Sequence, residues 1–351
     1  MKTLKKQKNI CNFFFKNLKK NYPQIISELG INHFGNLEIA KLLVNHVHRS
    51  GGYIIKNQTH DLHNEMVPDA RKVIPGNSTK SIYEIIKKNH LSFEDELKLK
   101  KYVEKKNMLY LSTPFSLESA IRLRDIGLKI MKIGSGEFNN LPLIEKVSKF
   151  KCFLILSTGM NDIKSIKRTV KILKKNKSKF LLMHCVSEYP NSFSNLNLDT
   201  ISYLKSIFKE TKIGYSDHSK SIIPSLAAVS KGAVLIEKHF IDNKKRKGPD
   251  IVCSMDPNEL KNLLNYVDII HKCSGLKKKI TAFEEITSKF AFASVVSTCD
   301  IDQGEKISTK NTWVKRPGTG DFLASSYYSL LGRTVKKFIK KDTLIKKNQI
   351  S

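Results

Sequence analysis

Two histidines stand where strands of a parallel sheet would end. His218 and His239 follow the seventh and eighth of the apolar, strand-like runs along the chain. Either one alone would be an ordinary buried or surface histidine, but neighbouring strand ends let two imidazoles converge on one divalent ion. Two imidazoles leave coordination positions open for a substrate carbonyl. The pair therefore predicts a site for a Lewis-acid metal.

A second group of polar residues at the same strand ends suits a small phosphorylated anion. The ammonium groups of Lys56 and Lys132 neutralise phosphate and carboxylate charge, and the amides of the Gly-Ser-Gly stretch 134–136 donate hydrogen bonds. Hydroxyl donors are available at Thr113, Ser135, Ser157 and Ser216. For any single serine, a strand-end or helix-capping role stays an open alternative.

Three carboxylates are candidates for proton transfer or for holding substrate hydroxyls. Glu28 ends the first strand-like run, Glu137 follows the fourth, and Asp250 lies in a Gly-Pro-Asp turn. For Asp250 a structural cap is the competing interpretation. The sequence does not fix which of the three does which task.

Alternating strand and helix patterns predict the scaffold that positions these residues. From about residue 23, short apolar runs alternate with longer amphipathic stretches, as in βα units. We expect strands at 24–28, 53–56, 108–112, 130–133, 153–157, 180–184, 212–216 and 233–237, and helices that include 37–49, 81–105, 117–125 and 162–175. Eight such units predict an α/β fold with a closed (β/α)8 TIM barrel, whose catalytic residues lie at the carboxyl ends of the strands.

The rest of the chain predicts an extension and a second domain around this barrel. We assign residues 1–22 to an N-terminal extension, 23–274 to the barrel, and the lysine-rich 275–289 to a linker. Residues 290–351 combine short strand-like pieces, 293–296 and 312–315, with Gly and Pro turns. A mainly-β module this small needs a partner surface for stability.

The composition argues against nucleic acid and membranes as partners. The formal net charge is +30, but only eight of the 62 basic residues are Arg, and nucleic-acid surfaces favour the Arg fork. The lysines are spread along the chain, which is typical of a solvated surface. Six cysteines form no CxxC pair, and no apolar run reaches the length of a membrane span. We expect a cytoplasmic protein.

Ten ordered segments closely resemble the bacterial N-acetylneuraminate (sialic acid) synthase family. The resemblance runs from about residue 23 to the C-terminus, and the order of the segments makes it specific. The segments are ELGINHFGN (28–36), IIKNQTH (54–60), VIPGN (73–77), STPF (112–115), KIGSGEFNN (132–140), LSTGM (156–160), YSDH (215–218), EKHF (237–240), GPDIVCSM (248–255) and WVKRPG (313–318).

The resemblance implies a metal-dependent synthase with two parts, a barrel and a small antifreeze-like module. The barrel of such enzymes binds phosphoenolpyruvate and a divalent metal, usually Mn2+, with Mg2+ or Co2+ possible. The module, a SAF domain of the β-clip type, covers the barrel mouth of the other subunit in a domain-swapped homodimer. Arg316, in WVKRPG, would then reach the sugar site of the partner subunit.

Family roles carry over to matching positions of this sequence. His218 and His239 match the metal ligands, and Glu28 matches a carboxylate that manages a proton or water. Phosphoenolpyruvate would be held by Lys56, Thr113, Lys132, Ser135, Ser157 and Ser216, and the sugar by Gln58, Asn77, Glu137, Tyr189 and Asp250. With Glu28, we expect Glu137 to act in catalysis.

The implied reaction joins phosphoenolpyruvate to N-acetylmannosamine. Carbon C3 of phosphoenolpyruvate attacks the aldehyde of the open-chain sugar, water adds at C2, and carbon–oxygen cleavage releases phosphate and N-acetylneuraminate. The segment 184–190 departs from the family pattern, because Ser187 and Glu188 replace an Asn and an aliphatic residue. Ser187 can still donate to phosphoenolpyruvate, whereas Glu188 adds a charge near the sugar.

Three alternatives stay open. A synthase of legionaminate or pseudaminate would use a diacetamido, 6-deoxy hexose, although QTHDLHNEM (58–66) favours N-acetylmannosamine. A Schiff-base pyruvate lyase would need a catalytic Lys and no metal, which the two histidines oppose. A basic module that binds polyanions without catalysis would leave the polar strand ends unexplained.

Overall fold

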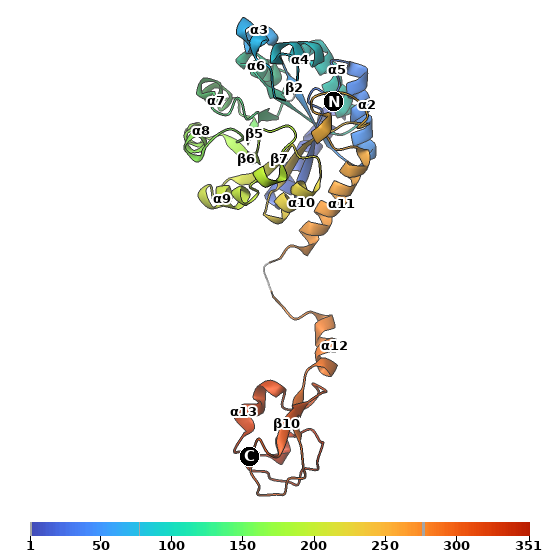
Figure 1. Cartoon of the computed structure of the whole chain (residues 1–351), viewed down its shortest axis with the longest axis vertical. Helices are drawn as coiled ribbons and strands as arrows, with labels where there is room; N and C mark the ends of the chain where they lie inside the picture. Colours follow the sequence, from blue (N-terminus) through green and yellow to red (C-terminus); the bar gives the residue numbers. More distant parts are fainter. Residues whose placement is uncertain (1, 77, 276–277) are drawn as a thin grey trace. The chain divides into compact units, whose positions relative to one another are not determined.

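A computed structural model describes residues 2–76, 78–275 and 278–351 of the chain. The chain divides into two compact units, Met1–Ser274 and Gly275–Ser351 (Figure 1). The first unit holds an eight-stranded parallel sheet, and the second holds a two-stranded antiparallel sheet, as far as the described residues extend.

The parallel strands of the first unit form a barrel. They are β1 (Gln24–Glu28), β2 (Ile54–Thr59), β3 (Leu109–Pro114), β4 (Ile130–Ile133), β5 (Phe153–Ser157), β6 (Lys179–Cys185), β7 (Lys212–Asp217) and β8 (Leu235–His239). The order β3-β2-β1-β8-β7-β6-β5-β4 joins β1 to β8, and β3 contacts β4. The predicted TIM barrel is confirmed.

Register explains why polar residues gather at one end of this barrel. Strands β1 and β8 pair from Gln24 opposite Leu235 to Glu28 opposite His239. All strands run in parallel, so their carboxyl ends lie at the same rim. Strand β8 ends two residues later than the sequence predicts, which makes His239 its last residue instead of the second residue after it.

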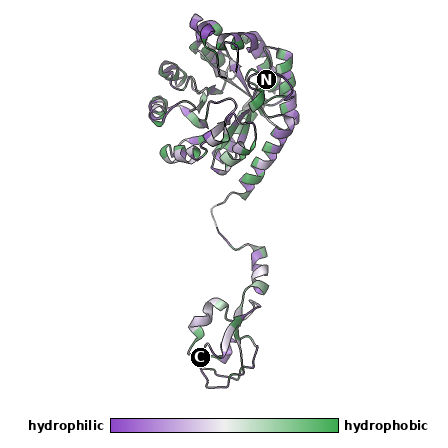
Figure 2. Ribbon diagram, in the orientation of Figure 1, coloured by the Kyte–Doolittle hydropathy of each residue, from purple (hydrophilic) through white to green (hydrophobic). Residues whose placement is uncertain are grey.

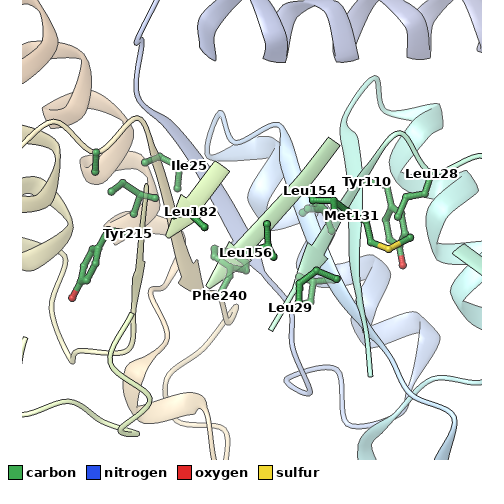
Figure 3. Close-up of a cluster of buried hydrophobic side chains, with 14 of the residues drawn as sticks. Ile25, Leu29, Tyr110, Leu128, Met131, Leu154, Leu156, Leu182, Tyr215 and Phe240 are labelled. Atoms are coloured by element: carbon green, nitrogen blue, oxygen red, sulfur yellow. The ribbon is translucent and has the colours of Figure 1, made fainter. Parts of the chain in front are cut away.

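Amphipathic helices surround the barrel, with hydrophobic and hydrophilic residues interspersed along them (Figure 2). They are α2 (Leu37–Arg49), α3 (Leu62–Glu65), α4 (Ile82–Asn89), α5 (Phe93–Lys105), α6 (Leu117–Asp125), α7 (Leu141–Val147), α8 (Ile163–Lys175), α9 (Asp199–Ile207), α10 (Ile223–Ser230) and α11 (Pro257–Cys273). Their apolar stripes pack on the strands in one continuous core that includes Leu154, Leu156 and Leu182 (Figure 3).

The single helix predicted over 81–105 is wrong, because the structure has two. Helix α4 ends before His90, whose backbone is extended at φ −78° and ψ 153°. Helix α5 then begins with Ser92 as its N-cap, which accepts a hydrogen bond from the Asp95 amide. The N-cap at Ser92 starts a second helix, so the chain must leave the first helix before it. The hydrophobic periodicity of the sequence alone does not reveal this break between α4 and α5.

Residues of the predicted N-terminal extension form a helix, α1 (Lys2–Lys19), that closes the amino end of the barrel. Phe14 is fully buried and Leu18 is 6% exposed. Both join a core cluster with the inward residues of the strands, among them Ile26, Ile54 and Ile155. The extension is therefore part of the barrel core.

A cavity of about 1360 Å3 lies beside α1, also at the amino end. Its lining includes the first residues of several strands, such as Leu109, Ile130 and Phe153, together with Phe15 of α1. The polar strand ends lie at the opposite rim. Cavity size therefore does not identify the site where the candidate catalytic residues meet.

The second unit is small and has its own core. It contains α12 (Ala282–Ala291), β9 (Ser294–Ser297), β10 (Thr312–Lys315) and α13 (Tyr327–Leu330), and β9 pairs with β10 in antiparallel register. Its core comprises Val295, Ile301, Ile307, Tyr327, Leu330, Val335, Ile339, Ile345 and Ile350. Helix α12 covers part of the stretch for which the sequence predicts a linker. No helix among the described residues is both long and apolar enough to cross a membrane.

Burial of Phe14 generates a prediction about stability. We expect Phe14→Ala to lower the free energy of unfolding by about 3 kcal/mol, because it leaves a cavity at the amino end of the core. The matched control is Phe13→Ala, since Phe13 is 48% exposed and its loss should cost less than about 1 kcal/mol. Urea denaturation measures both values, and equal losses would contradict the role of α1.

Candidate active site

The carboxyl rim of the barrel brings most of the predicted site residues together. Seven of them lie inside strands and are almost fully buried, although all seven are polar or charged. They are Glu28, Lys56, Thr113, Lys132, Ser157, Ser216 and His239. Buried polar groups are costly unless they are paired, so their partners describe the site.

One buried carboxylate, Glu237, connects the two predicted anion-binding lysines. Its Oε1 lies 3.2 Å from Lys132 Nζ and 3.7 Å from Lys56 Nζ. The hydroxyl of Ser216 donates to the same oxygen at 3.2 Å. Without this carboxylate, two ammonium groups would lie close together in a low-dielectric interior and repel each other.

The same lysines also hold hydroxyls of the predicted site. Lys56 Nζ donates to Thr113 Oγ1 at 3.0 Å, and Lys132 Nζ donates to Ser157 Oγ at 2.8 Å. Strands β2, β3, β4 and β5 thus contribute to one charged and hydroxyl-rich floor. An anion that enters this floor finds two ammonium groups and several O–H donors already in place.

Glu237 is a site residue that the sequence analysis missed. Burial alone would raise the pKa of its carboxyl, but the charges of Lys132 and Lys56 outweigh this effect and lower the pKa to about 2. The available signal was its position two residues before His239 in β8, because residues two apart in a strand face the same side. Both side chains therefore point to the barrel interior.

Glu28 and Gln58 form a second pair beside the lysines. Glu28 Oε2 lies 2.9 Å from Lys56 Nζ, and Gln58 Nε2 donates to Glu28 Oε1 at 3.0 Å. Burial raises the pKa of the Glu28 carboxyl, and the ammonium of Lys56 opposes this rise. A carboxylate in this setting can accept a proton more readily than one in water.

Ser135 and Ser187 meet at Gly159, in the loop after β5. The Gly159 amide donates to Ser135 Oγ at 3.1 Å. A Cβ atom at position 159 would lie 2.4 Å from Ser187 Oγ and 2.8 Å from Ser135 Oγ. Only glycine allows this approach, and it leaves two hydroxyls next to each other at the rim.

The two histidines lie side by side with Tyr189. The ring centroids of His218 and His239 are 5.5 Å apart, and Tyr189 lies 4.0 Å from His218. The Nδ1 atom of His239 is buried, has no hydrogen-bond partner and lies 3.6 Å from Asp250 Oδ2. Burial lowers the pKa of His239 to about 4, partly opposed by the charge of Asp250.

This histidine pair fits a divalent metal that keeps open positions. A neutral imidazole with an unpartnered nitrogen is the form that binds a metal. Within the described residues, no group of three or more His, Cys, Asp and Glu side chains is arranged to hold an ion. The residues present therefore suit a site with two imidazole ligands, not a closed protein cage.

Glu137 has the most unusual environment of the predicted carboxylates. Its Oε2 atom is buried without a hydrogen-bond partner, and a Cβ atom at Gly134 would lie 2.8 Å from it. Burial raises the pKa of Glu137 to about 7. A carboxyl with this pKa can give or take a proton near neutral pH.

The remaining sugar-site candidates are placed differently. Asn77 lies outside the described residues. Arg316 follows β10 in the second unit, where it is exposed. The side chain of Asp250 makes no capping hydrogen bond to the short helix that follows it, and its backbone carbonyl accepts a hydrogen bond from Ser254 Oγ at 2.7 Å, so the structural cap that the sequence left open is not formed. The carboxylate of Glu188 accepts from Ser192 and Asn195 of its own loop, at 3.3 Å each.

From the contacts of Glu237 with Lys56 and Lys132, we predict that the stability of the protein depends on pH. The pKa of Glu237 in the folded protein, about 2, lies below the ordinary glutamate value of 4.5, so the stabilisation is complete above pH 4.5 and is lost as pH falls towards 2. We expect Glu237→Gln to cost about 3 kcal/mol at pH 7 and to flatten the loss of stability below pH 4.5. Glu38→Gln removes an exposed pair with Lys41 and is the control. Equal urea midpoints for the two variants would contradict the role of Glu237.

Comparisons with known proteins agree with this architecture. The model of the NeuB family matches residues 43–279, and the model of the SAF domain matches residues 292–351. The N,N'-diacetyllegionaminic acid synthase of Campylobacter jejuni is 38% identical over 330 residues, which is 92% of this chain and 98% of the relative. The N-acetylneuraminate-9-phosphate synthase of Drosophila melanogaster is 29% identical over 93% of this chain and 95% of its own length.

The chain is also similar to a solved structure of a sialic acid synthetase. The N-acetylneuraminic acid synthetase of Leptospira borgpetersenii, in complex with citrate, has a TM-score of 0.70 and 34% identity. The match covers 77% of this chain and 92% of that one. The family model spans more than half of the chain. The chain therefore belongs to the NeuB family, and its carboxyl-terminal part is a SAF domain.

Proposed function

We propose that this protein condenses phosphoenolpyruvate with N-acetylmannosamine and water to give N-acetylneuraminate and phosphate. The observation that carries the proposal is the buried set of Lys56, Lys132 and Glu237 at the carboxyl rim, with the hydroxyls of Thr113, Ser157 and Ser216 around it. A nonulosonic-acid synthase needs such a floor for a small, highly charged phosphate ester.

Phosphoenolpyruvate has two anionic groups, and the floor offers two ammonium groups. Lys56 and Lys132 lie within 3.7 Å of one carboxylate, so both face the same space inside the barrel. Hydrogen bonds between ammonium groups and carboxylate or phosphate are the strong ones in proteins. Ser135 and Ser187, which meet at Gly159, would donate to the remaining oxygens of the ester.

A divalent metal, Mn2+ in our proposal, would be held by His218 and His239. When bound, it supplies Lewis acidity that polarises the aldehyde oxygen of the open-chain sugar. The chain itself keeps His239 neutral through burial and leaves its Nδ1 atom without a hydrogen-bond partner. Tyr189 and Asp250, which lie against the two imidazoles, would contact the sugar on the same side.

The carboxylates of the rim would manage the protons of the reaction. We assign Glu28 to the water that adds at C2, because it is buried beside Lys56 and its pKa is raised. Glu137, with a pKa of about 7, can donate a proton to the sugar oxygen as the new carbon–carbon bond forms. Loss of phosphate from the tetrahedral intermediate then makes the reaction irreversible.

The acceptor sugar has two candidates. N-acetylmannosamine is supported by the N-acetylneuraminic acid synthetase structure from Leptospira borgpetersenii. A diacetamido, 6-deoxy hexose is supported by the similarity to the N,N'-diacetyllegionaminic acid synthases of Campylobacter jejuni and Legionella pneumophila. The two sugars differ at C4 and C6, so the pocket that contacts these carbons decides between them.

The second unit has a role in this proposal as well. Arg316 is exposed there, and α12 carries the exposed apolar residues Phe283, Ile286 and Phe290. We propose a homodimer in which the SAF domain of one subunit covers the barrel of its partner and Arg316 contacts the sugar. Six free cysteines suit a reducing cytoplasm as its location.

Phosphate release decides between the acceptors. We expect the purified protein, after treatment with a chelator and addition of Mn2+, to release phosphate from phosphoenolpyruvate in the presence of N-acetylmannosamine. The parallel reaction contains the 2,4-diacetamido, 6-deoxy sugar, and a third reaction omits the metal. Release with the second sugar alone would move the assignment to legionaminate or pseudaminate synthesis. Release with neither sugar would refute both synthase assignments, and release without metal would refute the metal site.

A further inference from the structure

A chain of hydrogen bonds extends from Glu28 away from the predicted site. It runs from Glu28 through Gln58 to His60 and ends at Glu65 of α3. His60 and Glu65 have no role in the proposed reaction so far. Both lie in the segment 58–66, whose function the strand-end residues do not explain.

The Gln58 amide has a different partner at each end. Its Nε2 donates to Glu28 Oε1 at 3.0 Å, and its Oε1 lies 3.1 Å from His60 Nε2. If the amide were rotated by 180°, its carbonyl oxygen would face the Glu28 carboxylate, and two acceptors would meet without a hydrogen between them. The observed orientation therefore requires His60 to donate from Nε2.

Glu65 makes this donation possible. Its two carboxylate oxygens lie 2.8 Å and 3.1 Å from His60 Nδ1. With a carboxylate at one ring nitrogen and a carbonyl at the other, both nitrogens of His60 face oxygen acceptors. The neighbouring Asp61 is paired with Arg122 at 2.9 Å, so Glu65 is the carboxylate that holds the imidazole at Nδ1.

Packing prevents the imidazole from turning away. The His60 ring stacks on Phe115 with centroids 4.4 Å apart and an angle of 13° between the planes. His60 is only 8% exposed. A ring held between a carboxylate, an amide and an aromatic face has one orientation, and this orientation is passed on to the amide.

We infer that His60, held by Glu65, is a positioning residue that fixes Gln58 as a hydrogen-bond donor towards the acceptor sugar. The Gln58 carbonyl is occupied by His60 and one amide hydrogen by Glu28, so one N–H remains for a substrate oxygen. Gln58 then selects a hydroxyl or acetamido carbonyl oxygen, and Glu28 Oε1 is held in place. This inference rests on the proposed function of the same site.

Two substitutions of His60 separate positioning from packing. In His60→Gln, the new amide nitrogen takes the place of Nε2 and can still donate to Gln58. In His60→Asn, it takes the place of Nδ1 and reaches only Glu65. Both remove the ring from Phe115. We expect His60→Asn to raise the KM for the sugar about tenfold, the scale of one lost hydrogen bond, and His60→Gln to stay within about threefold of wild type.

The KM for phosphoenolpyruvate should change less than the KM for the sugar in both variants, because His60 reaches the lysine floor only through Gln58 and Glu28. Equal effects of the two variants on the sugar KM would overturn the inference and leave His60 a packing residue. Wild-type protein that releases no phosphate would instead refute the proposed function. Crystal structures of both variants give a readout that does not depend on turnover, since only His60→Gln should keep Gln58 bound to Glu28.

A second pair of variants applies if the His60 variants do not fold. Glu65→Gln keeps a hydrogen-bond partner for Nδ1, whereas Glu65→Leu removes it. We expect the sugar KM to rise in Glu65→Leu and to change less in Glu65→Gln. Identical KM values in these two folded variants would also overturn the inference.

Discussion

The site depends on a buried carboxylate, Glu237, that contacts both lysines, while a second one, Glu28, pairs with Lys56 alone. Glu237 lies between Lys56 and Lys132, inside a barrel whose other inward residues are mostly apolar at the amino end. Two ammonium groups can be kept in this interior only if a negative charge accompanies them. The same arrangement prepares the barrel for an anionic substrate, because the lysines are already oriented and desolvated. In the proposed reaction, stability and substrate binding therefore use the same charges.

The apolar core and the polar residues lie at opposite ends of the barrel. At the amino end, α1 and the inward apolar residues around Phe14 close the core. At the carboxyl end, the strands finish in hydroxyls, carboxylates and imidazoles that belong to neighbouring strands. Several of these polar residues have a partner from another strand, such as Thr113 with Lys56 or Ser157 with Lys132. The candidate site is thus built from residues that are distant in sequence.

The sequence predicts the barrel and most strands well, because buried parallel strands are short apolar runs that local pattern reveals. Strands β1, β4 and β5 have the expected bounds. The break between α4 and α5 was missed, because it depends on the N-cap at Ser92. The burial of Phe14 and Leu18 inside the barrel is not predicted either, since only the tertiary structure shows it.

Single residues of the site were harder to predict than the fold. The lysines and the histidines could be predicted because they stand at the ends of predicted strands. Glu237 lies within a strand, and only its contacts with the two lysines show that it belongs to the site. The orientation of Gln58 depends on His60 and Glu65, which follow it across a loop. Such networks depend on distances between side chains, and a pattern of residue types does not contain these distances.

Calorimetric titration with phosphoenolpyruvate tests the central claim most directly. The best comparison is between wild type and the double variant Lys132→Gln, Glu237→Gln, because removing both partners leaves no unpaired charge between these two positions. If the lysine floor binds the anion, the double variant should bind phosphoenolpyruvate at least about tenfold more weakly, while its fold is retained. Equal affinity in a folded double variant would contradict the account.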